Sequence, residues 1–172
     1  MIILSLGSNL SSSYGDRFYN LDLAISYLEN YNIQVIKKSS YYETPSYPDK
    51  NLPEFVNVGI LVEVDFDYFD LLKRILLIEK KIGRIRSNKN DPRVCDIDII
   101  DFNGCVKKAE NLELPHPRCH QRNFVLYPIK EINSKWIHPV LRKNVDFLIN
   151  DLSQNSRIEI TRLKKSVIIK HD

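Results

Sequence analysis

The stretch EFVNVGILVEVD, residues 54–65, decides the fold because its apolar side chains recur at every second position. Side chains of a β-strand point alternately to the two faces of a sheet. One face of this strand would carry β-branched residues alone: Val56, Val58, Ile60, Val62 and Val64. We therefore expect a strand whose valine-rich face lies in the core, since β-branched side chains pack well on a pleated surface.

The opposite face of that strand has a different character. It carries an aromatic ring at Phe55, an amide at Asn57 and no side chain at Gly59. An aromatic platform beside an amide and a glycine gap is suited to binding a flat ligand. Ordinary packing of Phe55 under a loop is the alternative interpretation.

Two amphipathic helices are predicted around this strand. Asp16 is a suitable N-cap for a first helix that ends near Asn30, and Asp67 for a second helix that Gly83 would terminate. Apolar residues recur at helical spacing in both: Phe18, Leu21, Ile25 and Leu28 in the first, and Leu71, Ile75, Ile78 and Ile82 in the second. Each helix can therefore bury one face on a sheet.

The remaining segments complete a β-α-β-β-α-β order. Three further strands are expected, at residues 2–6, 33–42 and 94–102. Asn103-Gly104 has the composition of a hairpin turn, residues 124–132 can be helical despite Pro128, and the tail 157–172 alternates enough for an added strand or hairpin. The order predicts an α+β fold of the ferredoxin-like βαββαβ class, a mostly antiparallel sheet with helices on one face and its other face free.

Length and charge favour one soluble domain. At 172 residues the chain has single-domain size, so we expect one domain over residues 1–172 with a basic C-terminal extension at 157–172. The extension holds five Lys or Arg against two acids, which accounts for the whole net charge of +3. Residues 1–156 are balanced, so no nucleic-acid partner is predicted.

No apolar run reaches the ~20 residues that a membrane span requires, and the short apolar N-terminus lacks a basic leader. We therefore expect no membrane partner and a cytoplasmic location. The three cysteines, Cys95, Cys105 and Cys119, are odd in number and form no C-x-x-C pair. This pattern disfavours a disulfide framework and a zinc site.

The run Pro92-Arg93-Val94-Cys95-Asp96-Ile97-Asp98 contains a candidate metal site. Asp96 and Asp98, two residues apart on a strand, would project from one face about 7 Å apart. Their hard oxygen ligands suit Mg²⁺, which binds a few carboxylates together with substrate phosphates. Two metal ions ~3.5–4 Å apart could clamp attacking and leaving oxygens there. A solvent-facing acidic strand is the alternative for an isolated pair of this kind.

Three arginines surround the loop that leads into this strand: Arg84, Arg86 and Arg93. Guanidinium groups match phosphate oxygens bidentately, and phosphoryl transfer depends on positioning and charge stabilisation. Acids for Mg²⁺ beside arginines for phosphates therefore favour a phosphoryl-transfer enzyme. Gly7-Ser8-Asn9 lacks the G-K-[ST] ending of a Walker A loop, so side chains must bind the phosphates.

An ordered set of short blocks now identifies a family. The blocks extend over roughly residues 3–139: Ser5-Leu6-Gly7-Ser8-Asn9-Leu10, Tyr42-Glu43-Thr44-Pro45, Phe55-Val56-Asn57, Glu79 with Gly83-Arg84, Pro92-Arg93 through Asp96-Ile97-Asp98, Leu114-Pro115-His116-Pro117-Arg118, and Arg122-Asn123-Phe124-Val125-Leu126. With them the chain resembles 6-hydroxymethyl-7,8-dihydropterin pyrophosphokinase. The resemblance implies transfer of pyrophosphate from ATP to the pterin hydroxymethyl group in folate biosynthesis, with AMP as the second product.

The resemblance also implies roles for individual residues. Two Mg²⁺ ions would be held by Asp96 and Asp98, and the transferred group would be stabilised by the catalytic residues Arg84 and Arg93. Residues matching the family's ATP site are Glu79, Arg86, Ile99 through its backbone, His116 and Arg122. Residues matching its pterin site are Thr44, Pro45, Phe55, Asn57 and Phe124, with the ring sandwiched between the two aromatic side chains.

The chain also departs from the family pattern. The loop 87–91 is slightly short, and its Asn90-Asp91 replaces a bulky residue followed by a small one. Asn111 stands where an arginine often contacts ATP. We expect these differences to alter nucleotide affinity, whereas the acids and flanking arginines of the metal centre are retained.

Two other functions remain as alternatives. An RNA-binding module of the RRM type shares the fold order and can present aromatic residues on an open sheet face, but its signature motif is missing. A metal-dependent nuclease would use the same carboxylates, but it leaves Phe55 and Asn57 unexplained. For the pyrophosphokinase, the expected partners are ATP and the pterin, and the next folate-pathway enzyme is a possible protein partner.

Overall fold

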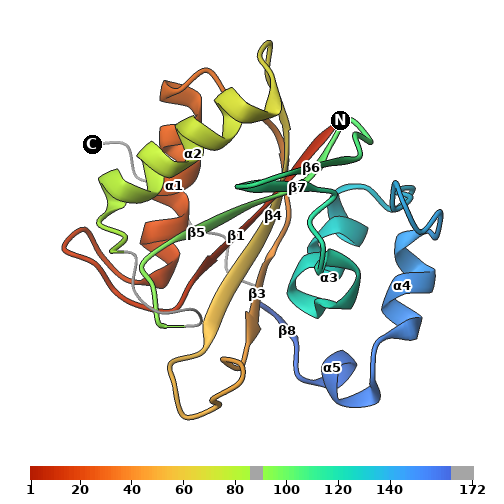
Figure 1. Ribbon diagram of the computed structural model, residues 1–172. Coiled ribbons are helices and arrows are strands. Elements are labelled where there is room, and N and C mark those ends of the chain that lie inside the picture. The colour runs from red at the N-terminus through yellow and green to blue at the C-terminus, as the bar shows by residue number, and fades with distance from the viewer. Residues whose placement is uncertain (86–90, 164–172) are drawn as a thin grey trace.

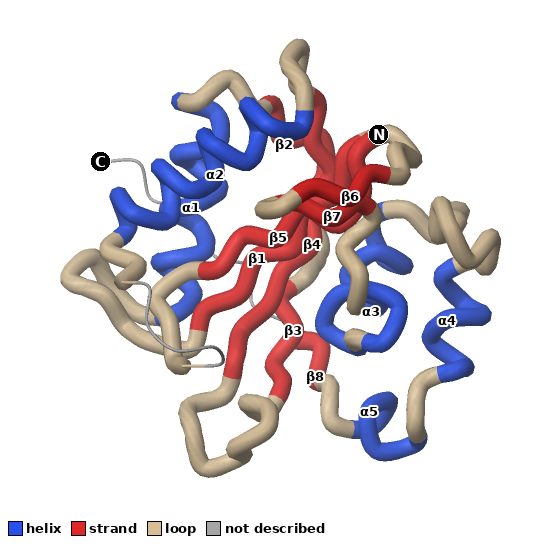
Figure 2. The backbone as a smooth tube through the Cα atoms, viewed as in Figure 1, coloured by secondary structure: helices blue, strands red, loops and turns tan. Residues whose placement is uncertain are grey.

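The computed structural model describes residues 1–85 and 91–163. Its centre is a six-stranded sheet in the order β5-β1-β4-β3-β8, in which β2 also pairs with β4 (Figures 1 and 2). The strands of this sheet are β1 (Ile2–Ser8), β2 (Gln34–Lys38), β3 (Tyr41–Thr44), β4 (Phe55–Glu63), β5 (Asp96–Phe102) and β8 (Thr161–Leu163). Their pairings are antiparallel.

Helices cover this sheet. They are α1 (Arg17–Asn30), α2 (Tyr68–Ile82), α3 (Asn123–Ile132), α4 (Val145–Asp151) and α5 (Gln154–Ile158), and a 3-10 turn at Cys119–Gln121 precedes α3. The order β1-α1-β2/β3-β4-α2-β5 is the expected βαββαβ unit, so the ferredoxin-like class is confirmed. No helix among residues 1–85 and 91–163 is long and apolar enough to cross a membrane.

The first face of the sheet packs against α1 and α2 as predicted. Four residues of the valine-rich face of β4 are fully buried there: Val56, Val58, Ile60 and Val62. The helix ends are also those expected. The side chain of Asp16 accepts a hydrogen bond from the backbone N–H of Tyr19, Asp67 caps α2, and Gly83 ends α2 with φ of 100°. A positive φ favours glycine, which has no Cβ to clash.

The second face of the sheet is not free, and here the prediction is wrong. Helices α3 and α4 form a second core on it around the fully buried Trp136 (Figure 1). Gly59 permits this packing, because a Cβ at that position would lie 2.7 Å from the Cβ of Pro128 in α3. The glycine gap of β4 is therefore filled by a helix, and the ligand floor is limited to the part of the strand before it.

Two expected strands differ in detail. The strand predicted at residues 33–42 is interrupted between β2 and β3, where Ser39 forms a backbone hydrogen bond to the carbonyl of Gly59 (2.9 Å) and accepts one from its N–H through Oγ (3.0 Å). Asn103-Gly104 turns with positive φ at both residues, but the strand that follows does not pair with β5. Instead β6 (Lys107–Ala109) pairs with β7 (Leu112–Leu114).

A β-bulge divides β5 into two parts. Leu4 pairs with Ile99 while Ile3 pairs with Asp101, so Ile100 is an extra residue in β5. Before the bulge, Ile97 and Ile99 enter the first core, and Ile100 enters the second core. Asp96 and Asp98, which precede the bulge, project from the face of β5 opposite Ile97. The regular alternation of side chains between the two faces of β5 ends at the bulge.

Candidate active site

A cavity of about 960 Å³ opens at one end of the sheet, on the face that carries α3. Its volume lies within the range of small-molecule sites. Asp96 of β5 pairs with Gly7 of β1, and Gly7 pairs with Asn57 of β4. These three residues form one row across the cavity floor. Since neighbouring strands are ~4.8 Å apart, the carboxylate and the amide belong to strands roughly 10 Å apart, with only a glycine between them.

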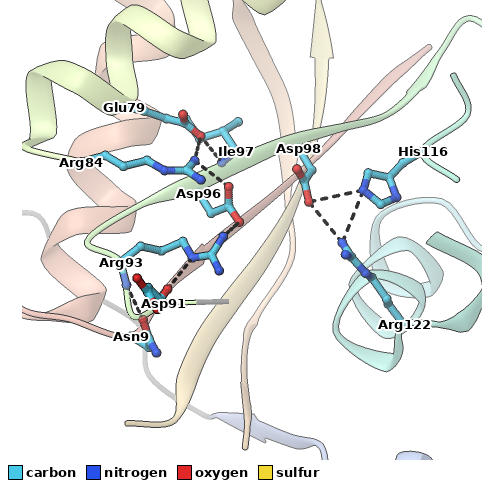
Figure 3. Close-up of polar contacts among 10 residues, drawn as sticks. All are labelled: Asn9, Glu79, Arg84, Asp91, Arg93, Asp96, Ile97, Asp98, His116 and Arg122. Carbon is cyan, nitrogen blue, oxygen red and sulfur yellow. Dashed lines mark hydrogen bonds and ion pairs between the residues drawn. The ribbon is translucent and has the colours of Figure 1, made fainter. Parts of the chain in front are cut away.

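Asp96 lies at the centre of a charged network (Figure 3). Its Oδ1 accepts from Arg84 Nη1 at 2.6 Å and its Oδ2 from Arg93 Nη1 at 2.9 Å. Arg84 also pairs with Glu79, which lies behind the floor and accepts a hydrogen bond from the backbone N–H of Ile97 at 2.8 Å. Burial opposes the charge of Arg84, but Asp96 and Glu79 outweigh it, so the pKa of Arg84 is raised.

The position of Arg93 is fixed by the first loop of the chain. Its backbone N–H donates to Asn9 Oδ1 (2.8 Å), and its carbonyl accepts from the N–H of Asn9 (3.1 Å). The same asparagine donates through Nδ2 to Ser46 Oγ and to the carbonyl of Pro53. Asn9 therefore connects the arginine to the base of the loop between β3 and β4.

Asp98 projects into the same cavity with a different environment. Its Oδ2 lies 3.3 Å from Arg122 Nη1 and 3.8 Å from His116 Nε2. Burial, and then the neighbouring charge of Asp96, raise the pKa of Asp98 to about 6 despite the nearby arginines. The carboxylate is still ionised at neutral pH. Burial also lowers the pKa of Arg122.

His116 is uncharged at neutral pH. Its burial, together with the charges of Arg122 and Arg118, lowers its pKa to about 4. Nδ1 accepts the backbone N–H of Arg118 at 3.1 Å, so the proton of the neutral ring is assigned to Nε2. His116 therefore presents an N–H donor toward Asp98 and the cavity (Figure 3).

The other end of the cavity is aromatic. Phe55 and Phe124 both line it, with the guanidinium of Arg93 5.9 Å from the first ring and that of Arg122 5.4 Å from the second. Asn57 is buried and donates through Nδ2 to Thr44 Oγ1 at 3.0 Å and to the carbonyl of Tyr42 at 3.3 Å. Its carbonyl oxygen is thereby oriented as an acceptor beside the space left by Gly7.

The structure brings most of the predicted residues together. Those that line the cavity are Thr44, Pro45, Phe55, Asn57, Arg84, Arg93, Asp96, Asp98, His116, Arg122 and Phe124. Glu79 supports Arg84 from behind, and the side chain of Ile99 lies in the first core. In the described part of the chain, neither residue is part of the cavity lining. Arg86 and residues 87–90 lie outside the described residues. The individual roles remain predictions.

Sequence reasoning gave no role to several residues of the site. Asn9 stands in the Gly7-Ser8-Asn9 block, which was a usable signal, but its contact with Arg93 spans 84 positions. Arg118 lines the cavity and follows His116 by two residues. A wall formed by α5, which includes Ser156, had no signal in the sequence at all.

A second polar cluster lies at the 3-10 turn. Ligand-type atoms of Cys119, His120 and His138 lie within 4.8 Å of one another. However, His138 Nδ1 accepts two backbone N–H bonds, from Val140 and Leu141, which assigns the ring proton to Nε2. Burial raises the pKa of the Cys119 thiol to about 12. Zinc binds a thiolate and unprotonated imidazole nitrogens, so binding here would require loss of the thiol proton and of the Nε2 proton of His138.

The chain is thus a ferredoxin-like α+β protein in which one cavity joins paired carboxylates, arginines and two aromatic rings. Residues 3–134 match the family model described as 7,8-dihydro-6-hydroxymethylpterin-pyrophosphokinase (HPPK). The chain belongs to this family.

Individual relatives agree with the family assignment. The chain is 34% identical over 142 residues to the 2-amino-4-hydroxy-6-hydroxymethyldihydropteridine pyrophosphokinase of Aquifex aeolicus, covering 83% of this chain and 86% of that one. It is 38% identical over 141 residues to the folic acid synthesis protein FOL1 of Dictyostelium discoideum, covering 82% of this chain. The chain spans only about a fifth of the length of such Fol1 proteins, 21% in that case.

Solved structures share the fold. A Plasmodium falciparum HPPK-DHPS crystal structure, of the A437G/K540E form with pterin and p-hydroxybenzoate, superimposes with a TM-score of 0.71 at 16% identity. It covers 94% of this chain and 46% of that chain. This likeness concerns the fold alone.

Proposed function

We propose that the chain transfers pyrophosphate from ATP to 6-hydroxymethyl-7,8-dihydropterin and releases AMP. One observation carries the proposal: a single cavity joins an Asp96–Asp98 carboxylate pair with its arginines to an Asn57–Phe55–Phe124 pocket. The names of the family and of the Aquifex aeolicus relative support the same activity. Each end of the cavity is suited to one of the two substrates.

The arginines are suited to bind the phosphates of ATP. Arg84, Arg93 and Arg122 each make an ion pair with Asp96 or Asp98, but a guanidinium has five donors and keeps others available. Phosphate oxygens can therefore bind the remaining N–H groups without loss of these pairs. His116 adds a neutral N–H donor, and Glu79 keeps Arg84 in place from behind.

Asp96 and Asp98 have the donor chemistry for Mg²⁺. Both are carboxylates from one strand face, both line the cavity, and their side chains are 26% and 34% exposed, so an ion from solvent can reach them. Mg²⁺ prefers such oxygen ligands combined with phosphate oxygens. We propose two ions in this site, which when bound would neutralise charge that develops on the transferred group.

The aromatic end is suited to a flat pterin. Phe55 and Phe124 offer apolar faces for stacking, and the carbonyl oxygen of Asn57 can accept a hydrogen bond from an N–H on the edge of the heterocycle. Thr44 and Pro45 complete this end. The absence of a side chain at Gly7 leaves the route open between the pterin and Asp96.

The reaction would follow from this arrangement. The hydroxymethyl oxygen attacks the β-phosphorus of ATP, an O–P bond forms, and the bond between that phosphorus and the oxygen bridging to the α-phosphate breaks. AMP leaves with the electron pair, and the hydroxyl proton passes to solvent. Arg84 and Arg93, which contact opposite oxygens of Asp96, would stabilise the charge on the transferred group.

Product analysis tests the proposal. The purified chain is incubated with ATP, Mg²⁺ and 6-hydroxymethyl-7,8-dihydropterin, and nucleotides are separated by chromatography. AMP should appear in equal amount to the pterin diphosphate, and only when both Mg²⁺ and the pterin are present. ADP as the sole pterin-dependent nucleotide would refute pyrophosphate transfer.

The alternatives lose support from the fold and the comparisons. An RRM-type RNA-binding surface requires an open sheet face, whereas α3 packs on that face here and α4 packs against α3. Relatives named for folic acid synthesis, and solved chains titled HPPK-DHPS, support a place in the folate pathway. We infer that residues 1–172 act as one catalytic domain in the cytoplasm, with the next enzyme of that pathway as a candidate partner.

A further inference from the structure

The segment 153–163, here called the C-terminal strap, forms one wall of the cavity. It comprises Ser153, helix α5 and strand β8, and it lies outside residues 3–134, which match the family model. Its cavity-lining residues are polar: Ser153, Asn155, Ser156 and Glu159. Two other cavity-lining residues contact the strap: Lys50 pairs with Glu159, and Asn123 bonds to Ser156.

The strap is joined to α3 beside the aromatic pocket. Asn123 Nδ2 donates to the carbonyl of Ser156 at 2.7 Å. The next residue in the chain is Phe124, whose ring lines the cavity. This hydrogen bond therefore ties the first turn of α3, which carries the ring, to the middle of α5.

The strap is also joined to the strand that leads into the pocket. In β8, Thr161 pairs with Glu43 and Arg162 with Tyr42. Arg162 reaches further, to Ser40 Oγ at 3.0 Å and to Glu131 of α3 at 3.1 Å. The strap thus contacts both β3 and α3, which also contact each other directly, because Glu131 accepts hydrogen bonds from Ser40 and Tyr42.

A third connection reaches the loop 45–54 between β3 and β4. The base of this loop is fixed by Asn9, which contacts Ser46 and Pro53. Nearer its tip, Lys50 forms an ion pair with Glu159 of the strap. The two side chains are 60% and 34% exposed, so water competes for both and the contact can open and close.

We propose that the C-terminal strap is a positioning wall for the acceptor substrate, and that Lys50 and Glu159 hold the loop 45–54 against it. The inference rests on the proposed function and extends it to residues beyond the family model. Its consequence is selective. Changes in the strap should weaken binding of the flat acceptor, whereas binding of ATP at the arginines should be unaffected.

A bulky residue on the strap tests the wall. Asn155→Trp places an indole on an exposed, cavity-lining position of α5, and Gln154→Trp places the same group on the adjacent exposed position that does not line the cavity. Steady-state assays should show KM for the pterin raised at least about tenfold by Asn155→Trp, with KM for ATP within about twofold of wild type. Gln154→Trp should leave both values unchanged. Equal effects of the two variants would overturn the proposed wall.

Loss of the ion pair tests the contact with the loop. Lys50→Met, Glu159→Gln and the double variant should each raise KM for the pterin about two- to fivefold, as expected for an exposed pair, without additivity in the double variant. Lys130→Met is the matched control, because Lys130 forms a similarly exposed ion pair with Asp146 at 2.6 Å between α3 and α4. Additive effects, or an equal effect of Lys130→Met, would contradict the proposal.

Two readouts separate this inference from the proposed function. Wild-type turnover is measured first, and AMP formation establishes the reaction on its own. Pterin binding is then followed by pterin fluorescence with a non-hydrolysable ATP analogue present. If the wild type forms AMP but Asn155→Trp binds the pterin as tightly as the wild type, the proposed role of the strap is refuted and the pyrophosphokinase function stands. If the wild type forms no AMP, the pyrophosphokinase function is refuted.

Discussion

The two ends of the cavity are built in different ways. At the end proposed to bind phosphates, here called the phosphate end, Asp96 and Asp98 stand two residues apart on one strand, and Arg93 precedes them on the same segment. At the end proposed to bind the pterin, here called the acceptor end, the walls come from β3, β4, α3, the loop 45–54 and the strap. The two carboxylates of the first end thus follow from local strand geometry, although Asn9, Arg84 and Arg122 reach them from other segments, whereas the second end depends throughout on the docking of distant segments. Substitutions at the phosphate end should reduce turnover, and those at the acceptor end should weaken binding.

The largest effect is expected at Asp98. Asp98→Asn keeps the shape of the side chain but removes the negative charge proposed to bind Mg²⁺, so kcat should fall on the order of 10³-fold. AMP formation at saturating substrates measures the effect, and circular dichroism checks the fold. Asp70→Asn, at an exposed ion pair on α2, is the control. Near-normal turnover of Asp98→Asn would remove this residue from the metal site.

Arg93 should give the next largest effect. Arg93→Met removes a donor proposed to stabilise the transferred group, and kcat should fall roughly 10²-fold. Asn9→Ala removes the side chain that positions Arg93 through its backbone and should give a smaller loss of kcat in the same assay. If Asn9→Ala lowered kcat by the same factor in the Arg93→Met variant as in the wild type, Asn9 would act independently of Arg93.

Substitutions at the acceptor end should change KM for the pterin. Phe124→Ala removes one stacking surface, and KM for the pterin should rise roughly tenfold, given the strength of stacking on aromatic side chains. KM for ATP should change little, because the arginines and carboxylates remain. Separate titrations of the two substrates distinguish these values. A larger change in KM for ATP than for the pterin would show that the two ends are not independent.

The smallest effect concerns pH. The pKa of Asp98 is raised to about 6, so its charged form prevails above pH 6 and is lost as the pH falls through that value. From pH 7.5 to 5.5 the ionised fraction falls about fourfold, and apparent Mg²⁺ affinity should fall with it. Because bound Mg²⁺ favours the charged form, the change should appear in Mg²⁺ titrations at each pH. Asp98→Asn should abolish it.

The same contrast explains which features the sequence could predict. Strand β4, both helix caps and the shared face of Asp96 and Asp98 follow from period-two alternation, capping chemistry and a spacing of two. These are local rules, and each involves residues within a few positions. The structure confirms the elements, and it places the two carboxylates in one cavity.

The features that sequence reasoning missed depend on long-range packing. Covering of the second sheet face required Gly59 to meet Pro128, a contact across 69 positions that neither residue signals alone. Residues 103–104 have the turn composition of a hairpin, yet β6 pairs with β7 instead. The strap has no local pattern that points to a cavity wall, since its role arises only once α3 and β3 are in place.

The extra residue in β5 has a consequence for how this family member can change over time. Because Ile100 is an extra residue, the parts of β5 before and after it pair with β1 in different registers. Asp101, just beyond, accepts a hydrogen bond from the indole of Trp136 at 2.8 Å. Insertions or deletions beyond Ile100 would therefore disturb the attachment of the second helical layer while leaving Asp96 and Asp98 in phase. The bulge therefore separates the two cavity-lining carboxylates from structural changes in the part of β5 that holds the second helical layer.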